Sequence, residues 1–212
     1  MWIRALEDWY KMELVGTNGV MNVATLAKVL GKQEEDLVIP GGKKVRSIVW
    51  KGDDLKQINS LLHNQSANLP TLVKVNGPMP AWLATALVHE CHPMSVALNT
   101  PEGYVTVGCQ LPKGAGEGVK EWKLTQKGDW TTVEFILDGN FTPTQLEKVV
   151  PPEVPFGARV IVSGRGPLYL AASVAMAYHG TAKAVACLQP GVGATVCITH
   201  TLETELGSVI PV

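Results

Sequence analysis

The chain is 212 residues long, is 46% hydrophobic and carries a formal net charge of −1. The hydrophobic fraction is enough for one large core or two small ones, so we expect a folded chain rather than a disordered one. The balance of charges leaves no broad positive surface for long DNA or RNA, so an anionic ligand must be bound locally.

The N-terminal sequence and the cysteines indicate a reducing, intracellular setting. Glu7 and Asp8 stand where a signal peptide needs an unbroken apolar run, and no segment approaches the ~18 apolar residues of a membrane helix. We therefore expect a cytoplasmic protein without a membrane partner. The cysteines match neither a C-x-x-C metal motif nor a disulfide framework, so we expect free, mostly buried thiols at Cys91, Cys109, Cys187 and Cys197.

The first seventy residues predict three helices and one strand. Two helices are expected over residues 5–12 and 22–31, the second with Asn22 as its N-cap and Gly31 just after its end. A strand at Ile48-Val49 and a helix over residues 55–62 follow. The pattern assigns no role to this N-terminal extension.

A strand-loop-helix-strand unit follows. Residues 73–75 predict a strand, 76–80 a turn, and the next segment a helix that ends at His92. An apolar strand then runs from residue 96 to Pro101, and a glycine precedes a second strand.

Residues 112–118 hold three glycines and a proline, which predicts a linker. Beyond it, alternating runs over 121–125 and 131–137 predict a β-hairpin around the turn 127–130, and a short helix is expected over 142–150.

The second half repeats the unit. A strand over 158–162 leads into Ser163-Gly164-Arg165-Gly166-Pro167, a helix ending at His179, a strand ending at Pro190, and a further strand after a glycine. Pro167 precedes His179 by the same twelve positions that separate Pro80 from His92. We interpret this as a tandem duplication and predict an α/β fold of two Rossmann-like units with mixed, largely parallel sheets. The predicted boundaries are 1–111, the linker 112–118, and 119–212.

The strand-to-helix turns are the candidate ligand sites, because open α/β sheets bind ligands at the carboxyl ends of their strands. A helix start presents unpaired, partly positive N–H groups, and an arginine can bind phosphate oxygens in pairs. The alternative is that the glycines only allow close packing. The first turn has one glycine and no arginine, so it is the poorer anion site. The candidate ligand-binding residues are Asn76, Gly77, Ser163, Gly164, Arg165 and Gly166.

His92 and His179 are the candidate catalytic residues. At a helix C-terminus the helix dipole favours a protonated imidazole, which suits a general acid or base; the alternative is that each only caps the last carbonyls. His89 and His92 are three positions apart, not four as in H-E-x-x-H, and no third ligand is identifiable, so we assign no metal residues.

The stretch from about Trp122 to Val212 resembles the small ring nucleases of type III CRISPR systems, which are CARF-like, Rossmann-related proteins. Residues 45–110 resemble a more diverged member. The resemblance rests on residues 160–167, the helix to Tyr178-His179, the strand 185–190 with Gly193-Ala194, Thr199-His200-Thr201, and 207–210.

The resemblance implies binding of cyclic oligoadenylate, typically the tetra-adenylate ring, and its cleavage by the ribose 2′-hydroxyl, which arginine and histidine would promote. The family's catalytic histidine aligns with His92 without a gap and with His179 after a one-residue shift. The resemblance also implies symmetric assembly of protomers, so a homodimer is possible.

The chain departs from the family at the Asp-Pro-Arg motif, whose aspartate supports manganese-dependent cleavage. Here the positions are Gln189-Pro190-Gly191 and Thr100-Pro101-Glu102. Binding is therefore better supported than cleavage, manganese enters only through the resemblance, and a metal-independent mechanism is expected. The alternatives are a non-catalytic interaction module of a CRISPR system and a phosphodiesterase for another nucleotide.

Overall fold

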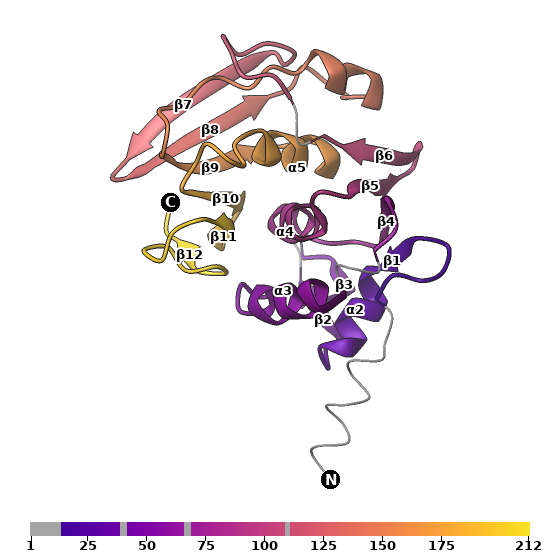
Figure 1. Ribbon diagram of the computed structural model, residues 1–212. Coiled ribbons are helices and arrows are strands. Elements are labelled where there is room, and N and C mark those ends of the chain that lie inside the picture. The colour runs from indigo at the N-terminus through magenta and orange to yellow at the C-terminus, as the bar shows by residue number, and fades with distance from the viewer. Residues whose placement is uncertain (1–13, 39–41, 66–68, 109–110) are drawn as a thin grey trace.

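Two mixed β-sheets flank a central pair of helices, α4 and α5 (Figure 1). The computed structural model describes residues 14–38, 42–65, 69–108 and 111–212. Parallel strand pairs lie in the middle of both sheets, and helices cover them, so the α/β class predicted from the sequence is confirmed. The helix predicted over residues 5–12 lies outside the described residues.

The first sheet has four strands in the order β1-β4-β5-β6. The neighbours β1, β4 and β5 are parallel, and β6 returns antiparallel to β5. The strands are β1 (Val20–Asn22), β4 (Leu72–Asn76), β5 (Ser95–Thr100) and β6 (Gly103–Val107).

The second sheet has six strands in the order β12-β11-β10-β9-β8-β7. Its central strands β8, β9 and β10 are parallel, and the outer pairs are antiparallel. The strands are β7 (Glu121–Lys127), β8 (Trp130–Ile136), β9 (Arg159–Gly164), β10 (Ala184–Gln189), β11 (Gly193–Thr199) and β12 (Val209–Ile210). The predicted hairpin is β7-β8, and it turns at Gly128 and Asp129.

The same order of elements occurs in both halves. In the first, β4, helix α4 (Ala81–Cys91), the parallel strand β5 and the antiparallel strand β6 follow one another. In the second, β9, helix α5 (Leu168–Ala177), the parallel β10 and the antiparallel β11 do the same. His92 is the C-cap of α4, and His179 follows Tyr178, the C-cap of α5, so both histidines lie at helix ends as the spacing predicted.

The smaller elements confirm several predictions. Helix α2 (Val23–Val29) has Asn22 as its N-cap, whose Oδ1 accepts from the Ala24 N–H, and Gly31 follows with φ +68°. Helix α3 (Asp54–Gln65) and the 3₁₀ helix η2 (Pro143–Lys148) match the predicted helices.

The strand predicted at Ile48-Val49 belongs to a separate two-stranded sheet. It is observed as β3 (Lys44–Ile48), which pairs with β2 (Glu34–Val38) in a separate hairpin. In the second sheet, β8 is the parallel neighbour of β9. The equivalent neighbour of β4 in the first sheet is β1, a strand of only three residues. Such a short strand carries too little alternation to stand out in the sequence.

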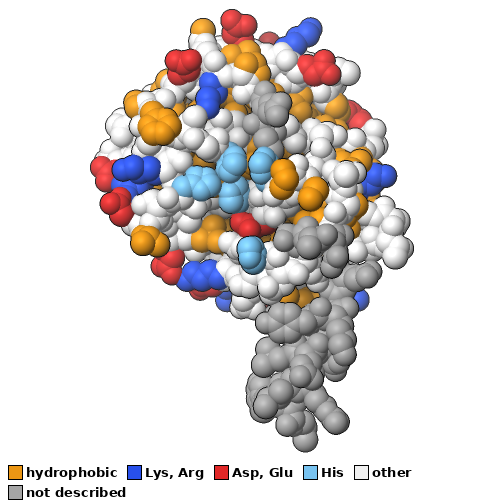
Figure 2. Space-filling view, in the orientation of Figure 1, with side chains coloured by type: hydrophobic (Ala, Val, Ile, Leu, Met, Phe, Trp, Pro, Cys, Tyr) orange, Lys and Arg blue, Asp and Glu red, His pale blue; other side chains and the backbone are white. Residues whose placement is uncertain are grey.

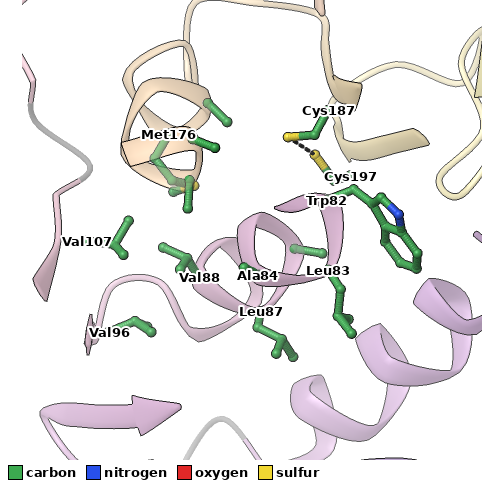
Figure 3. Close-up of a cluster of buried hydrophobic side chains, with 14 of the residues drawn as sticks. Trp82, Leu83, Ala84, Leu87, Val88, Val96, Val107, Met176, Cys187 and Cys197 are labelled. Atoms are coloured by element: carbon green, nitrogen blue, oxygen red, sulfur yellow. Dashed lines mark hydrogen bonds between the residues drawn. The ribbon is translucent and has the colours of Figure 1, made fainter. Parts of the chain in front are cut away.

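Helices α4 and α5 are apolar on every side, because each packs on its own sheet and on the other unit. All residues from Trp82 to Val88 and from Tyr169 to Ala177 are buried. Besides its own strands, α4 contacts β10 and β11, and α5 contacts β6. Figure 3 shows Val88 of α4 and Met176 of α5 in the cluster of buried side chains that joins the two units. One hydrophobic core therefore runs through both halves.

The predicted linker is held by backbone hydrogen bonds. The Gly114 N–H donates to the Pro151 carbonyl, and Glu117 and Val150 exchange a pair of bonds. Gly118 lies so close to the Lys148 carbonyl that an added Cβ would be 2.3 Å from its oxygen. The segment thus runs along the residues that precede β9.

Cys91, Cys187 and Cys197 are free and buried, as predicted, whereas Cys109 lies outside the described residues. Burial raises the pKa of the Cys91 thiol to about 12, so the reactive thiolate is disfavoured there. None of the helices in the described ranges has the length and apolarity to cross a membrane.

We expect Gly164→Ala to lower the free energy of unfolding by on the order of 2–4 kcal/mol. Gly164 has φ +145°, and an added Cβ would lie 2.6 Å from two ring atoms and the carbonyl oxygen of Phe135. Gly103→Ala is the control: its φ is +110° but no atom lies within 4 Å of the added Cβ, so its loss should be nearer 1 kcal/mol. Equal losses in urea unfolding would contradict the role of the Phe135 contact.

Candidate functional site

Helices α4 and α5 lie side by side and run in the same direction. Ala81 at the start of α4 lines the same pocket as Leu168 at the start of α5. At the other end the rings of His92 and His179 are 5.3 Å apart. The helix pair therefore has two ends: the loop end, formed by residues 76–81 and 163–168 with the strand ends beside them, and the histidine end, formed by the histidines that follow.

Two pockets lie at the loop end. The larger has a volume of about 340 Å³ and the smaller about 290 Å³. The larger is lined by Pro80, Ala81, Gly164, Gly166, Leu168, Ala171, Leu188, Gln189 and Pro190. The smaller is lined by Asn99, Thr100, Pro101, Glu102, Phe141, Pro167, Leu168 and Tyr169.

Each pocket combines a strand end of one unit with the helix start of the other. The larger brings Gln189-Pro190 at the end of β10 to Pro80-Ala81 at the start of α4. The smaller brings Thr100-Pro101 at the end of β5 to Pro167-Leu168 at the start of α5. The pockets are thus related by an approximate two-fold exchange of the units, and both strand-to-helix turns face the same end of the molecule.

The loop end offers hydrogen-bond donors. Pro80 and Pro167 occupy the N-cap positions of α4 and α5, and neither helix start has a side-chain cap, so first-turn N–H groups remain available. Arg165 is exposed, and none of the ion pairs found within the described ranges involves it. Its guanidinium is therefore available to an anionic ligand.

A cross-unit hydrogen bond supports the larger pocket. The Trp82 Nε1–H donates to Gln189 Oε1 at 2.8 Å, and Trp82 is 2% exposed. The side chain at this strand end is thus fixed by the other unit.

The predicted ligand-binding residues differ in their access to these pockets. Gly164 and Gly166 line the larger one, and Arg165, which lies between them in the sequence, is exposed beside it. Asn76 accepts from Asn99 Nδ2 at 2.8 Å, and Asn99 lines the smaller pocket. Ser163 is the last buried residue before the turn, 7% exposed.

The glycines have a packing role of their own. An added Cβ at Gly77 would lie 3.0 Å from the Cβ of Val23, and one at Gly166 would lie 2.9 Å from Leu137 Cδ1. Gly164 likewise lies close to Phe135. These short distances explain why glycine occupies the three positions even when no ligand is bound. The support for anion binding therefore comes from Arg165, the uncapped helix starts and the pockets.

At the histidine end, four imidazoles meet on one face, which Figure 2 shows open to solvent. The His179 ring centroid is 5.0 Å from that of His89 and 5.2 Å from that of His200, and His89 is 5.6 Å from His200. His92 lies on the exposed side of His179. His89 Nδ1 is hydrogen-bonded to Glu90 Oε1 at 2.9 Å.

Burial and the neighbouring imidazoles lower the pKa of His179 to about 4. Burial and His89 also lower the pKa of His200. The expectation that the helix dipole favours a protonated His179 is therefore wrong: desolvation and adjacent imidazoles outweigh the dipole. A neutral imidazole can accept a proton or bind a metal, so His179 suits a base or a ligand better than an acid.

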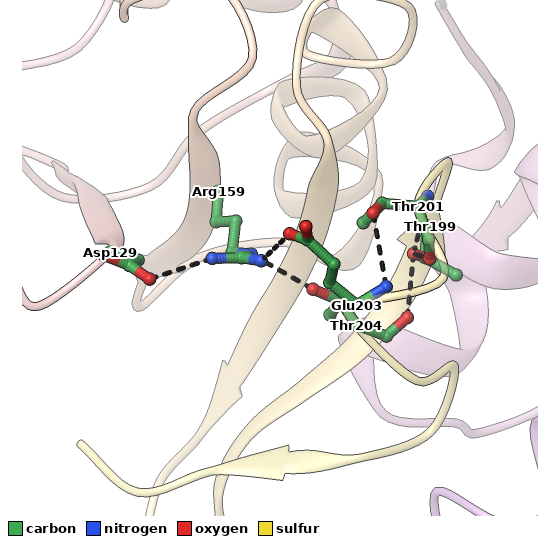
Figure 4. A network of polar contacts seen from close by, with 6 residues as sticks. All are labelled: Asp129, Arg159, Thr199, Thr201, Glu203 and Thr204. Atoms are coloured by element: carbon green, nitrogen blue, oxygen red, sulfur yellow. Dashed lines mark hydrogen bonds and ion pairs between the residues drawn. The ribbon is translucent and has the colours of Figure 1, made fainter.

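A polar network holds the turn that carries His200 (Figure 4). The guanidinium of Arg159 contacts Asp129 Oδ2 at 3.0 Å and Glu203 Oε2 at 2.8 Å, and its Nε–H donates to Thr204 Oγ1 at 3.1 Å. The hydroxyl of Thr199 lies 2.9 Å from the Thr204 carbonyl oxygen. The turn after β11 is thus fixed on both sides of His200.

The histidine end and Arg165 are far apart. They lie at opposite ends of α5, whose 10 residues span about 15 Å. The structure brings the two predicted histidines together but does not bring either to the predicted ligand-binding turn.

Comparison with known proteins identifies the second half of the chain. The family CRISPR-associated protein (Cas_csx3) matches residues 134–211. An uncharacterized protein of Aquifex aeolicus (strain VF5) is 31% identical over 98 residues, which cover 43% of this chain and 87% of that protein. The chain belongs to the CRISPR-associated Cas_csx3 family. The predicted CRISPR association is confirmed.

The Cas_csx3 match includes Arg165, His179 and His200 but not His89 or His92. It runs from β8 to β12 and thus contains the second strand-loop-helix-strand unit. The histidine end and both pockets combine residues inside the match with residues of the first unit, outside it.

The manganese that the ring-nuclease resemblance implies does not fit this Cas_csx3 chain at the expected position. Gln189 and Thr100 replace the carboxylate, and Gln189 accepts a hydrogen bond from Trp82. Manganese prefers carboxylate, carbonyl and water oxygens. We therefore derive no chemical step through manganese.

Sequence reasoning missed His89 and His200 as parts of one site. Strand β11 returns antiparallel to β10, so its end lies beside the start of β10, and Ala184 pairs with Thr199. This places His200 next to the end of α5. His89 joins because α4 runs alongside α5, which sequence periodicity does not reveal. One feature of the sequence could have indicated His200: it directly follows β11, the second strand of the antiparallel pair β10-β11.

We expect the free energy of unfolding of the metal-free chain to fall more steeply than that of His179→Gln between about pH 6.5 and about pH 4. The pKa of His179 is about 4 in the folded chain and about 6.5 in the unfolded chain. The unfolded state therefore binds more protons in this window, and stability falls as the pH falls. Urea unfolding across this range in EDTA measures the difference. Parallel curves for wild type and His179→Gln would contradict the lowered pKa.

Proposed function

We propose that this Cas_csx3 protein binds a cyclic oligoadenylate, with cyclic tetra-adenylate as the expected ring, at the loop end during type III CRISPR signalling. The observation that supports this most is the reciprocal pair of pockets. A ring of identical nucleotides presents the same groups at opposite positions, and the two exchanged strand-end and helix-start pairs offer similar surfaces to them.

The chemistry of the loop end suits such a ligand. The uncapped starts of α4 and α5 present N–H groups to phosphate oxygens, and Arg165 adds a charge-assisted contact. The half-buried apolar side chains of Leu168, Leu188 and Phe141 provide surfaces for adenine bases. Phosphates and bases are thus matched by different parts of one surface.

The geometry favours binding and sequestration of the ring over its cleavage at the loop end. The predicted catalytic histidines are about 15 Å away, the length of α5, so they do not contact a phosphate held by Arg165. A sequestering protein lowers the free messenger concentration without chemistry.

Ring cleavage at the histidine end is the second candidate function. The lowered pKa of His179 keeps its imidazole neutral near pH 7, and the exposed His92 lies beside it. A neutral imidazole there is suited to take a proton from a ribose 2′-hydroxyl aligned for in-line attack on its phosphodiester, and this role requires no manganese.

We expect Arg165→Ala to weaken binding of cyclic tetra-adenylate by about 10- to 100-fold, because one charge-assisted hydrogen bond contributes about 1.5–3 kcal/mol. Calorimetry with the intact ring measures this loss. The matched control is Arg46→Ala, another exposed arginine, located on β3, which should bind like the wild type. Unchanged binding in Arg165→Ala would remove the loop-end site, and no binding by the wild type would favour the interaction module.

We expect cyclic tetra-adenylate to remain intact after long incubation with the chain, both with manganese and with EDTA. Chromatography of the nucleotide after denaturing the protein distinguishes bound ring from linear product. Linear product that persists in EDTA and disappears in His179→Gln would establish the second candidate instead. A melting temperature raised by another nucleotide but not by the ring would point to a different phosphodiester ligand.

A further inference from the structure

The histidine end has the composition of a metal site assembled from three separate segments. His89 comes from the last turn of α4, His179 follows α5, and His200 follows β11. Each contributes one ring nitrogen, and these three nitrogens lie within 4.8 Å of one another. The ring centroids form a nearly equilateral triangle with sides of 5.0, 5.2 and 5.6 Å.

This spacing is close to that of a bound ion. Three nitrogens at the usual zinc distance of 2.0–2.1 Å and tetrahedral angles are about 3.3 Å apart. Binding an ion would therefore draw the three nitrogens closer together than the 4.8 Å limit observed. His200 is exposed, so a fourth position would face solvent.

A supporting hydrogen bond fixes one of the rings. His89 Nδ1 lies 2.9 Å from Glu90 Oε1, and both side chains are less than a fifth exposed. When Nδ1–H donates to this carboxylate, Nε2 is left as the free lone pair. A carboxylate behind a histidine is the usual outer-shell arrangement at zinc sites, where it orients the ring and increases its basicity.

The donor set also selects the kind of ion. Three imidazoles without a carboxylate ligand suit zinc, cobalt or nickel, whereas manganese prefers oxygen ligands. We propose that His89, His179 and His200 bind one divalent ion of the zinc class, with the fourth position open to solvent. Because His89 lies outside the Cas_csx3 match and the other two lie inside it, the ion would connect both units of the chain. Zinc sites with three protein ligands and an open position are the catalytic type.

Zinc titration of the chelator-stripped chain tests this, with a chromophoric chelator as competitor and no nucleotide present. We expect one zinc ion per chain, a raised melting temperature, and no competition from an equal concentration of manganese. Glu90→Gln, which changes the carboxylate behind His89, should weaken zinc binding by about 10- to 100-fold. His89→Gln and His200→Gln each remove a ligand, so each should weaken zinc binding at least as much. His63→Gln is the matched control and should bind like the wild type.

Two measurements on the wild-type chain keep the test independent of whether the variants fold. Cobalt should give the intense visible absorption of a tetrahedral complex. Zinc should slow the modification of His200 by diethyl pyrocarbonate, measured by mass spectrometry, and leave that of His63 unchanged. Zinc binding that survives in both His89→Gln and His200→Gln, or equal modification rates with and without zinc, would overturn the proposal. Because no oligoadenylate is used, failure of the proposed nucleotide binding does not affect this result.

Discussion

The shared core and both candidate sites depend on the packing of α4 against α5. Both helices are apolar around their whole circumference, so neither can be stable at a surface, and each is covered only when its own sheet and the other unit are both present. Their parallel arrangement brings the two helix starts to one end and the histidines to the other. The pockets, the Trp82 to Gln189 hydrogen bond and the imidazole cluster all follow from this contact.

The sequence contained most of the local structure. The β7-β8 hairpin, the Asn22 cap of α2, and the two strand-to-helix turns were predictable because turn and cap chemistry acts over a few residues. The location of β1 was not, because three residues show no clear period and their pairing with β4 is a long-range contact. Likewise, the repeat indicated two equivalent histidines, yet the meeting of His89 with His200 depends on how α4 and β11 pack, which no local pattern encodes.

The two candidate sites use the unit interface in different ways. At the loop end the units exchange equivalent surfaces, so the pockets resemble each other, although only one turn carries an arginine. At the histidine end the contribution is unequal: the Cas_csx3 region supplies His179 and His200, and the first unit supplies His89 with Glu90. The relative from Aquifex aeolicus is matched over 98 residues that make up 87% of its length, so it has the size of one unit.

Carrying both units on one polypeptide has a consequence for how the protein responds to dilution. A cluster shared between separate subunits disassembles when the protein becomes scarce, whereas the first half of this chain is always present next to the second at a high effective concentration. Few copies in a cell would therefore suffice to keep the interface complete. Each half is also free to change by itself, as the single arginine and the unequal histidine contributions illustrate.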